Sequence, residues 1–219
     1  MKSEITILSK MNENKMNENN IDQIDINHLF ENLKIKTSDT AINGVVEQMK
    51  NSGSLEEKCI LAREFINPQS TIMEQIIKRD LEIGKKTNET SGDGSKDGKN
   101  YEIKFSGHDK DSKFNWVQIR PHHNVDYYIL IGYNLYEGPM GTAYNFKIPA
   151  EDLYQLIIDY GGYAHGTNKE LGAITKDNFA KGGNVEYALR INPNHLGKKS
   201  TKLWGKLKNY ITPYHKDHY

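Results

Sequence analysis

The segment from Asp93 to Lys104 contains the residues most capable of chemistry. It reads D-G-S-K-D-G-K-N-Y-E-I-K and places two carboxylates, Asp93 and Glu102, and the ammonium of Lys104 around one expected tight turn. Paired carboxylates can hold a divalent cation, and Mg²⁺ prefers one or two of them together with water and phosphate oxygens. A lysine beside such a cation can orient the attacking water or stabilise charge that develops on a phosphate. The segment therefore predicts a metal-assisted hydrolytic site.

The dipeptide Asp97-Gly98 predicts the turn of a β-hairpin. A two-residue type I′ turn needs positive φ at both central positions, and Asp-Gly tolerates it. Counting outward from this turn places Asp93 directly opposite Glu102, with Cα atoms about 4.5 Å apart. If the turn lies elsewhere, Asp97 becomes the competing acid. Strand alternation puts Glu102 and Lys104 on one face and a core-facing set on the other: Tyr101, Ile103 and Phe105.

Two carboxylates directly across a hairpin repel each other unless a compensating charge is present. A divalent cation would supply that charge, with Asp93 and Glu102 as its ligands. Alternatively, Lys104 simply neutralises two acids on an exposed hairpin that has only a structural role. The segment by itself is compatible with both interpretations.

The arrangement of Asp93, eight intervening residues and Glu102-Ile103-Lys104 resembles the motif of the PD-(D/E)xK nuclease superfamily, which includes most type II restriction endonucleases. Gly92 stands where that motif often has proline, a common variation. The resemblance implies a Mg²⁺-dependent type II restriction enzyme that acts on double-stranded DNA as a homodimer and leaves 5′-phosphate and 3′-hydroxyl ends. It implies metal binding by Asp93 and Glu102 and a catalytic role for Lys104.

An acid on the preceding helix often completes the site in this superfamily. Glu74 is the best match by position, and Glu82 is the substitute. However, Thr71-Ile-Met-Glu74 is also a capping box, in which Glu74 would only close the start of a helix. Both interpretations of Glu74 stay open at this point.

The segments around the hairpin predict an α/β fold. Phe114–Arg120 is expected to form a short helix ended by a proline, and Asp126–Tyr133 a buried strand. Tyr144–Ile148 is expected to be a further strand, and a helix should follow from Pro149 to Tyr160. The resemblance implies a restriction-endonuclease-like core, with a mixed sheet flanked by helices, within about residues 70–162.

The N-terminal region is expected to be helical behind a flexible tail. Residues 1–20 contain K-M-N-E-N twice and have nothing to bury. Ser38 and Ser54 are predicted helix N-caps, and Ser54-Leu-Glu-Glu57 is a capping box. Cys59 is the single cysteine and lies in an apolar stretch, so we expect a buried thiol. Residues 21–219 are expected to form a single domain.

Polar residues just after the hairpin are candidate DNA contacts. Gln118 and Arg120 would lie on the predicted helix beside the hairpin, from which they could face a phosphate backbone. His122, in the following loop, could contact a phosphate. For all three residues the alternative is an ordinary surface position.

The C-terminal region, about residues 163–219, is the basic part of the chain. From residue 181 onward it contains eight Lys or Arg against two acids, whereas residues 1–66 contain eleven acids against eight bases. Lysines interleaved with aromatic residues suit phosphates, although an apolar helical stripe around Trp204 favours a core role for the aromatic residues. Two glycine-rich segments there match no nucleotide-binding motif. The candidate DNA contacts in this region are Asn168, Lys169, Asn184, Lys198, Lys199 and Lys202.

The composition favours a cytoplasmic protein without a membrane segment. The 219 residues have zero formal net charge and 36% hydrophobic residues. No apolar run approaches the roughly 18 residues that suggest a membrane span, and no secretory signal opens the chain. Two other function classes stay open: a structure-selective or repair endonuclease resembling a Holliday-junction resolvase, and a non-catalytic DNA-binding protein with a structural acidic hairpin.

Overall fold

The structure of the protein, a computed structural model, describes residues 39–65, 69–107, 113–160, 163–165, 174–179 and 185–219. The predicted tail at residues 1–20 and the predicted N-cap Ser38 lie outside these residues. So do three of the candidate DNA contacts: Asn168, Lys169 and Asn184.

Helices precede the first strand, as predicted: α3 (Asp39–Asn51), α4 (Leu55–Phe65) and α5 (Gln69–Asp80). The predicted N-cap of α4 is confirmed, because Ser54 Oγ accepts a hydrogen bond of 3.3 Å from the backbone N–H of Glu57. The Glu57 carboxylate accepts a hydrogen bond from Ser52, whose hydroxyl oxygen also accepts the Ser54 N–H. Cys59 of α4 is buried, as expected.

The main sheet is mixed and has the strand order β1-β2-β4-β5. Strand β2 runs parallel to β4, while β1 is antiparallel to β2 and β5 is antiparallel to β4. The sheet confirms the predicted α/β class and the two predicted strands that became β4 and β5. The bounds are Gly94–Lys96 for β1, Lys99–Gly107 for β2, Tyr127–Asn134 for β4 and Thr142–Pro149 for β5.

A second, antiparallel sheet has the order β3-β7-β6. Its strands are β3 (Phe114–Ile119), β6 (Tyr163–His165) and β7 (Glu186–Ile191). The prediction of a helix over Phe114–Arg120 is therefore wrong. Phe114 and Trp116 are buried while Asn115 between them is exposed, which is the two-residue period of a strand. The register shifts after Trp116, and Gln118 has φ 57°, so a bulge interrupts the strand.

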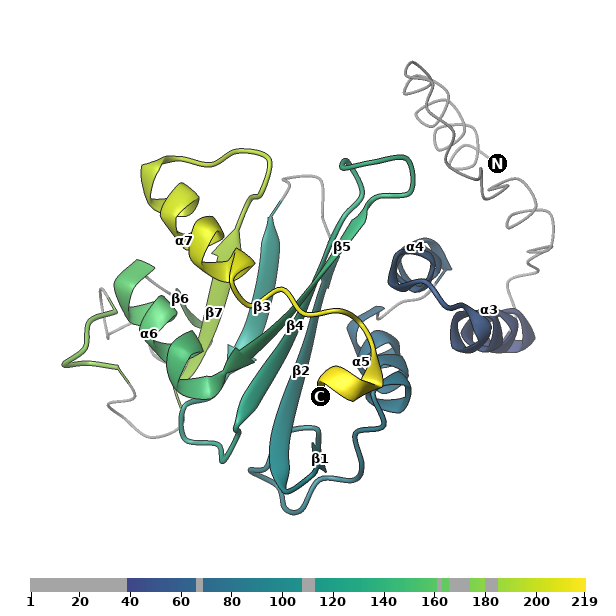
Figure 1. Cartoon of the computed structure of the whole chain (residues 1–219), viewed down its shortest axis with the longest axis horizontal. Helices are drawn as coiled ribbons and strands as arrows, with labels where there is room; N and C mark the ends of the chain where they lie inside the picture. Colours follow the sequence, from purple (N-terminus) through teal and green to yellow (C-terminus); the bar gives the residue numbers. More distant parts are fainter. Residues whose placement is uncertain (1–38, 66–68, 108–112, 161–162, 166–173, 180–184) are drawn as a thin grey trace.

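Helices lie on both sides of the main sheet (Figure 1), and each of its faces has an apolar core. Helices α3, α4 and α5 cover the first face, where Ile77 of α5 packs in one cluster with Ile103 and Ile129. The second sheet, together with α6 (Ala150–Tyr160) and α7 (Lys198–Lys208), covers the other face. The predicted helix before Tyr160 is thus confirmed as α6.

Helix α7 presents its apolar stripe to the second core. Leu203, Trp204 and Leu207 are buried there, in agreement with the core role expected for this stripe. The lysines of α7 are exposed on its other side: Lys198, Lys199, Lys202, Lys206 and Lys208. The helix packs against α6 (Figure 1).

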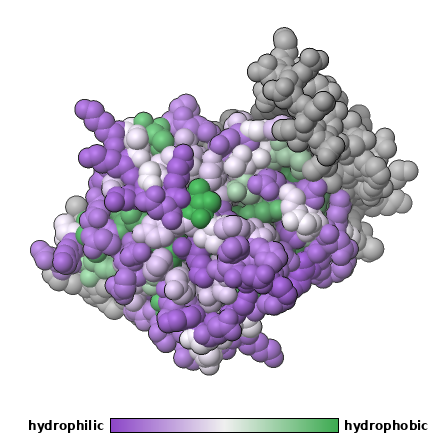
Figure 2. Space-filling view, viewed as in Figure 1, coloured by the Kyte–Doolittle hydropathy of each residue, from purple (hydrophilic) through white to green (hydrophobic). Residues whose placement is uncertain are grey.

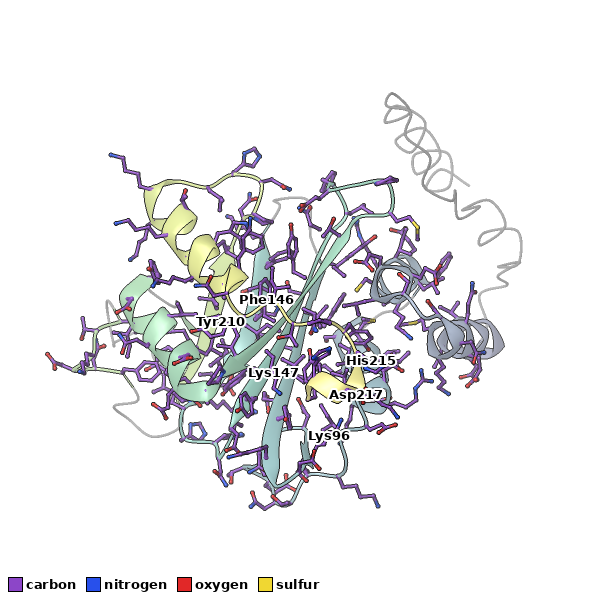
Figure 3. The ribbon with its side chains drawn as sticks, viewed as in Figure 1. Lys96, Phe146, Lys147, Tyr210, His215 and Asp217 are labelled. Atoms are coloured by element: carbon purple, nitrogen blue, oxygen red, sulfur yellow. The ribbon has the colours of Figure 1, made fainter. Side chains whose placement is uncertain are left out.

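The chain after α7 crosses the outer edge of β5 (Figure 3). The Lys147 N–H donates to the Tyr210 carbonyl at 3.0 Å, and the Thr212 N–H donates to the Asn145 carbonyl at 2.9 Å. Farther along, the Lys96 ammonium donates to the Lys216 carbonyl at 2.6 Å, next to β1. One edge of the main sheet is therefore covered by the C-terminal segment.

Hydrophobic side chains do not form a continuous patch on the face seen in Figure 2, which is mostly hydrophilic. Among the described residues, the large hydrophobic side chains that stay exposed are Tyr136 and Ile211. Within the same part of the chain, every helix is too short or too polar to cross a bilayer.

Candidate active site at the open edge of strand β2

The hairpin has the predicted turn and register. Asp97 and Gly98 have φ of 50° and 75°, as a type I′ turn requires. The paired residues across the hairpin are those counted from the sequence: Gly94 with Tyr101, Ser95 with Asn100, and Lys96 with Lys99.

The predicted position of Asp93 directly opposite Glu102 is not found, because strand β1 begins at Gly94. The chain enters β1 through Gly92, whose φ is 72°. A Cβ atom at Gly92 would lie 2.5 Å from the Tyr101 carbonyl oxygen, so only glycine fits this approach. The N–H of Asp93 then donates to that same carbonyl at 2.8 Å, which places Asp93 beside the edge of β2.

Strand β1 is only three residues long, so the edge of β2 beyond Tyr101 has no strand partner among the described residues. Two carboxylates take the place of a strand there. Asp93 Oδ2 accepts a hydrogen bond of 2.7 Å from the N–H of Ile103, and the Glu74 carboxylate is hydrogen-bonded to the backbone of Phe105. Both acids are therefore fixed against the same stretch of β2, Asp93 from the hairpin and Glu74 from α5.

Glu102 and Lys104 project from one face of β2, as the alternation predicted. Both are buried, with only 5% and 8% of their surfaces exposed. The Lys104 Nζ atom lies 2.5 Å from Glu102 Oε1. The alternative of an exposed hairpin is therefore wrong for these two residues, whereas a neutralising role of Lys104 stays open. Burying an ion pair costs desolvation energy that its Coulomb attraction does not reliably recover.

The four residues influence one another electrostatically and form one group, the acid–lysine cluster: Glu74, Asp93, Glu102 and Lys104. Burial raises the pKa of Glu74 to about 7; the Lys104 charge opposes this shift, and the Asp93 and Glu102 charges add to it. Burial also raises the pKa of Glu102, again opposed by Lys104 and increased by Asp93. The cluster thus holds three carboxyl groups close to one ammonium, in a partly dry environment.

The structure contradicts the capping-box interpretation of Glu74. Helix α5 begins at Gln69, so Thr71 lies inside the helix and cannot be the N-cap of a capping box with Glu74. The alternative acid Glu82 is exposed and forms an ion pair of 2.6 Å with Lys216. Asp97 is exposed in the turn and does not compete with Asp93. Of the candidate acids, the structure brings together Glu74, Asp93 and Glu102.

The acid–lysine cluster has a donor set that suits Mg²⁺ as the resemblance implies. Within the described residues, no group of three or more His, Cys, Asp or Glu has the arrangement of a protein-only metal cage. Mg²⁺ commonly uses one or two carboxylates and completes its shell with water and substrate phosphate oxygens. Asp93 and Glu102 fit this partial shell. Burial is the main cause of the raised pKa values of Glu74 and Glu102, and the charge of Asp93 adds to both.

No protein-family model, curated protein or solved structure matches the chain.

Arg120 lies next to the cluster at the end of β3. Its Nε and Nη2 atoms contact Glu186 Oε1 of β7 at 2.7 and 2.6 Å. The Arg120 charge also lowers the pKa of Glu102, although less than burial raises it. This candidate DNA contact is thus close to the cluster but held by a carboxylate.

The remaining candidate DNA contacts after the hairpin have weaker connections to the cluster. Gln118 is exposed at the bulge of β3 and does not lie on a helix. His122 is exposed, and its ring meets that of His123 edge-on at 4.7 Å. His123, not a candidate from sequence, has a pKa lowered first by burial and then by the charges of His122, Arg120 and Lys104.

A surface depression that the sequence did not predict lies beside the cluster. Its volume is about 420 Å³, and it is lined by Lys78, Lys85, Lys86, Gly92 and Asp93. Asp93 belongs to both the depression and the acid–lysine cluster, so the depression borders the candidate active site at this residue. The signal in the sequence was the Lys85-Lys86 pair between α5 and the hairpin, which lacks any motif of its own.

Proposed function

We propose that this protein is a Mg²⁺-dependent endodeoxyribonuclease of the PD-(D/E)xK type, acting as a type II restriction enzyme on double-stranded DNA in the cytoplasm. The observation that carries the proposal is the acid–lysine cluster, which joins an acid from α5 to the three motif residues of the hairpin. The mixed sheet flanked by helices supports a restriction-endonuclease-like core. A homodimer would supply one such site for each strand of the duplex.

Each cluster residue has a role that its contacts support. Asp93 and Glu102 would hold Mg²⁺, which when bound lowers the pKa of water and neutralises charge on the phosphate. The hydrogen bond from Ile103 fixes the Asp93 carboxylate for this purpose. The Lys104 ammonium, held by Glu102, would stabilise charge that builds on the phosphate. Glu74, with a pKa of about 7, can accept a proton at its carboxylate near neutral pH.

The proposed reaction is hydrolysis of a phosphodiester. The water oxygen forms a bond to phosphorus while the bond between phosphorus and the 3′ oxygen breaks. The proton lost by the water is taken up near the site, and the departing 3′ oxygen gains a proton. The products carry a 5′-phosphate and a 3′-hydroxyl.

A non-catalytic role is the second candidate, and one observation favours it. Asp93 and Glu74 both accept backbone hydrogen bonds from the unpaired edge of β2, so they have a structural use as edge caps. In that case the protein would bind DNA without cutting it.

Asp93→Asn separates the two candidates, because asparagine keeps an acceptor oxygen for the Ile103 N–H but removes the charge that would hold a cation. The matched control is Asp97→Asn, four residues along in the turn, where asparagine tolerates the positive φ. We expect wild-type protein and Asp97→Asn to cut plasmid DNA with Mg²⁺ but not with a chelator, and Asp93→Asn to be inactive.

The pattern of cleavage distinguishes the remaining classes. Discrete fragments from plasmid DNA indicate a restriction enzyme and reveal its recognition sequence. Preference for a four-way junction over linear duplex indicates a structure-selective nuclease. Equal cleavage by Asp93→Asn and wild-type protein, or no cleavage by any form, contradicts the proposed nuclease.

A further inference from the structure

The depression beside the acid–lysine cluster has an excess of positive charge. Three of its five lining residues are lysines, and Asp93 is its single carboxylate. The Asp93 carboxylate already accepts a hydrogen bond from the Ile103 N–H. A cation alone would be repelled by three ammonium groups, so the lining favours an anionic ligand.

The three lysines differ in how firmly they are held. The Lys78 ammonium donates to the Asp93 backbone carbonyl. Because an ammonium has three N–H donors, further donors stay available for a ligand. Lys86 is paired with the exposed Glu89 at 2.8 Å, an i,i+3 contact at the surface that a stronger anion can displace. Within the described residues Lys85 forms no ion pair, and its side chain is exposed. Two of the ammonium groups can therefore turn toward a ligand.

The backbone that presents Lys85 and Lys86 is held on both sides. Gly84 N–H donates to the Ser95 carbonyl at 2.8 Å, which ties the start of this loop to β1. Farther along, Ser91 is fully buried, and its hydroxyl oxygen accepts the N–H groups of Thr87 and Asn88, each at 2.9 Å. A loop fixed in this way presents its lysines with less loss of conformational entropy on binding.

Gly92 forms the part of the depression that leads to Asp93. The absence of a side chain at Gly92 leaves its backbone accessible to a ligand in the depression. A phosphate held there would be the neighbour of a phosphate placed at the cluster. Nucleic acids have such consecutive phosphates, one for each nucleotide of a strand.

We propose that the depression lined by Lys78, Lys85 and Lys86 binds the phosphate backbone of a DNA strand next to the bond that the acid–lysine cluster would cut. This inference rests on the proposed nuclease function. It places the DNA strand on the side of the hairpin that faces α5. It also predicts that these lysines contribute more to DNA binding than the exposed lysines of α7. The contacts are with phosphates, so they do not depend on base sequence.

The test measures binding separately from cleavage. A fluorescent 20- to 30-base-pair duplex of arbitrary sequence, in chelator so that it is not cut, is titrated with the full chain at several salt concentrations. The test variant is Lys85→Ala/Lys86→Ala. The matched control is Lys198→Ala/Lys199→Ala, which removes the same number of exposed lysines from α7. Thermal melting checks that both variants fold as the wild type does.

We expect Lys85→Ala/Lys86→Ala to weaken duplex binding about tenfold and to reduce the slope of log K against log salt by about 2, roughly one per lysine removed. The α7 control should change both quantities much less. Unchanged affinity and slope in Lys85→Ala/Lys86→Ala would overturn the inference, as would a larger effect from the α7 control or no binding by wild-type protein at low salt.

The outcomes also separate this inference from the proposed nuclease. If the lysine pair affects binding but wild-type protein never cuts DNA with Mg²⁺, the phosphate site is supported and the nuclease fails. If wild-type protein cuts and the lysine pair changes neither binding nor its salt dependence, the nuclease is supported and the phosphate site is overturned.

Discussion

Strand β2 is buried on both faces, but its two faces are built from opposite kinds of side chain. Tyr101, Ile103 and Phe105 enter an apolar core with α3, α4 and α5. On the other face, Glu102 and Lys104 are equally buried yet form an ion pair beside two further carboxylates. Burial stabilises the first face through the hydrophobic effect, whereas it opposes ionisation on the second. A strand that needed only stability would not be built this way, so the polar face is where function is to be sought.

The largest expected effect is the loss of cleavage when the polar face is made neutral. Glu102→Gln/Lys104→Met removes both charges while it keeps the side chains near their original size. We expect cleavage to fall by about a thousandfold or more, because charge stabilisation in the transition state is lost. The free energy of unfolding should stay the same or increase, because a buried ion pair is replaced by uncharged groups.

Plasmid cleavage and denaturant unfolding measure these two quantities on the same preparation. Lys99→Ala, an exposed lysine at the start of β2, is the control and should leave both unchanged. If the double variant loses several kcal/mol of stability, the polar face is structural after all.

The opposite result is expected on the apolar face. Ile103→Ala removes a fully buried side chain and should lower the free energy of unfolding by about 2–5 kcal/mol. The cluster residues are not altered, so the cleavage rate per folded molecule should stay near that of the wild type. Denaturant unfolding gives the first value, and cleavage measured well below the melting temperature gives the second. A fully folded but inactive Ile103→Ala protein would contradict the separation of the two faces.

Gly92→Ala should disturb the backbone segment that positions Asp93 beside the edge of β2. The new Cβ would meet the Tyr101 carbonyl oxygen at 2.5 Å, at a φ of 72° that alanine rarely adopts. We expect a loss of about 2–3 kcal/mol in the free energy of unfolding, together with reduced cleavage.

Gly98→Ala is the matched control, because Gly98 has φ 75° but no atom within 4 Å of its Cβ position. The free energy of unfolding of Gly98→Ala should fall by only about 1 kcal/mol, because alanine is less stable than glycine in the left-handed conformation. Its cleavage activity should be kept. Equal effects from the two variants would show that the close approach at Gly92 does not position Asp93.

The smallest effect concerns the pH dependence of stability. The pKa of Glu74 is about 7 in the folded protein, above its ordinary value of 4.5, so the folded state holds this proton more tightly than the unfolded state. Its ionisation therefore lowers stability as pH rises from about 4.5 to 7, and the full loss is present above pH 7. Glu74→Gln cannot ionise, so its stability relative to the wild type should increase by on the order of 1 kcal/mol between pH 5 and pH 8.

Denaturant unfolding of both proteins across this pH range measures the difference. Glu82→Gln is the control, because Glu82 is exposed and its pKa is lowered by the hydrogen bond from Lys216. Its stability relative to the wild type should not increase over the same range. A Glu74→Gln difference that stays constant with pH would show that Glu74 is not in a dry, acidic environment.

The structure also shows where local patterns were sufficient and where they failed. The Asp97-Gly98 turn and the alternation along β2 were predicted because both depend on neighbouring residues alone. The helix expected at Phe114–Arg120 is a strand, because pairing with β7, about 70 residues later, overrides a weak local preference. Asp93 is not paired with Glu102 as predicted, because the chain turns at Gly92 and strand β1 begins only at Gly94.

The sequence by itself determined the hairpin, the two-faced character of β2 and the residues Asp93, Glu102 and Lys104 as one candidate set, because turn geometry and strand period are local properties. Only the tertiary structure decided that Glu74 joins them and that Glu82 and Asp97 do not. It alone showed that the ion pair is buried and that Lys78, Lys85 and Lys86 line a depression at Asp93. These features depend on contacts between separate segments of the chain, such as α5 with β2 and β3 with β2, whose relative positions no local pattern specifies.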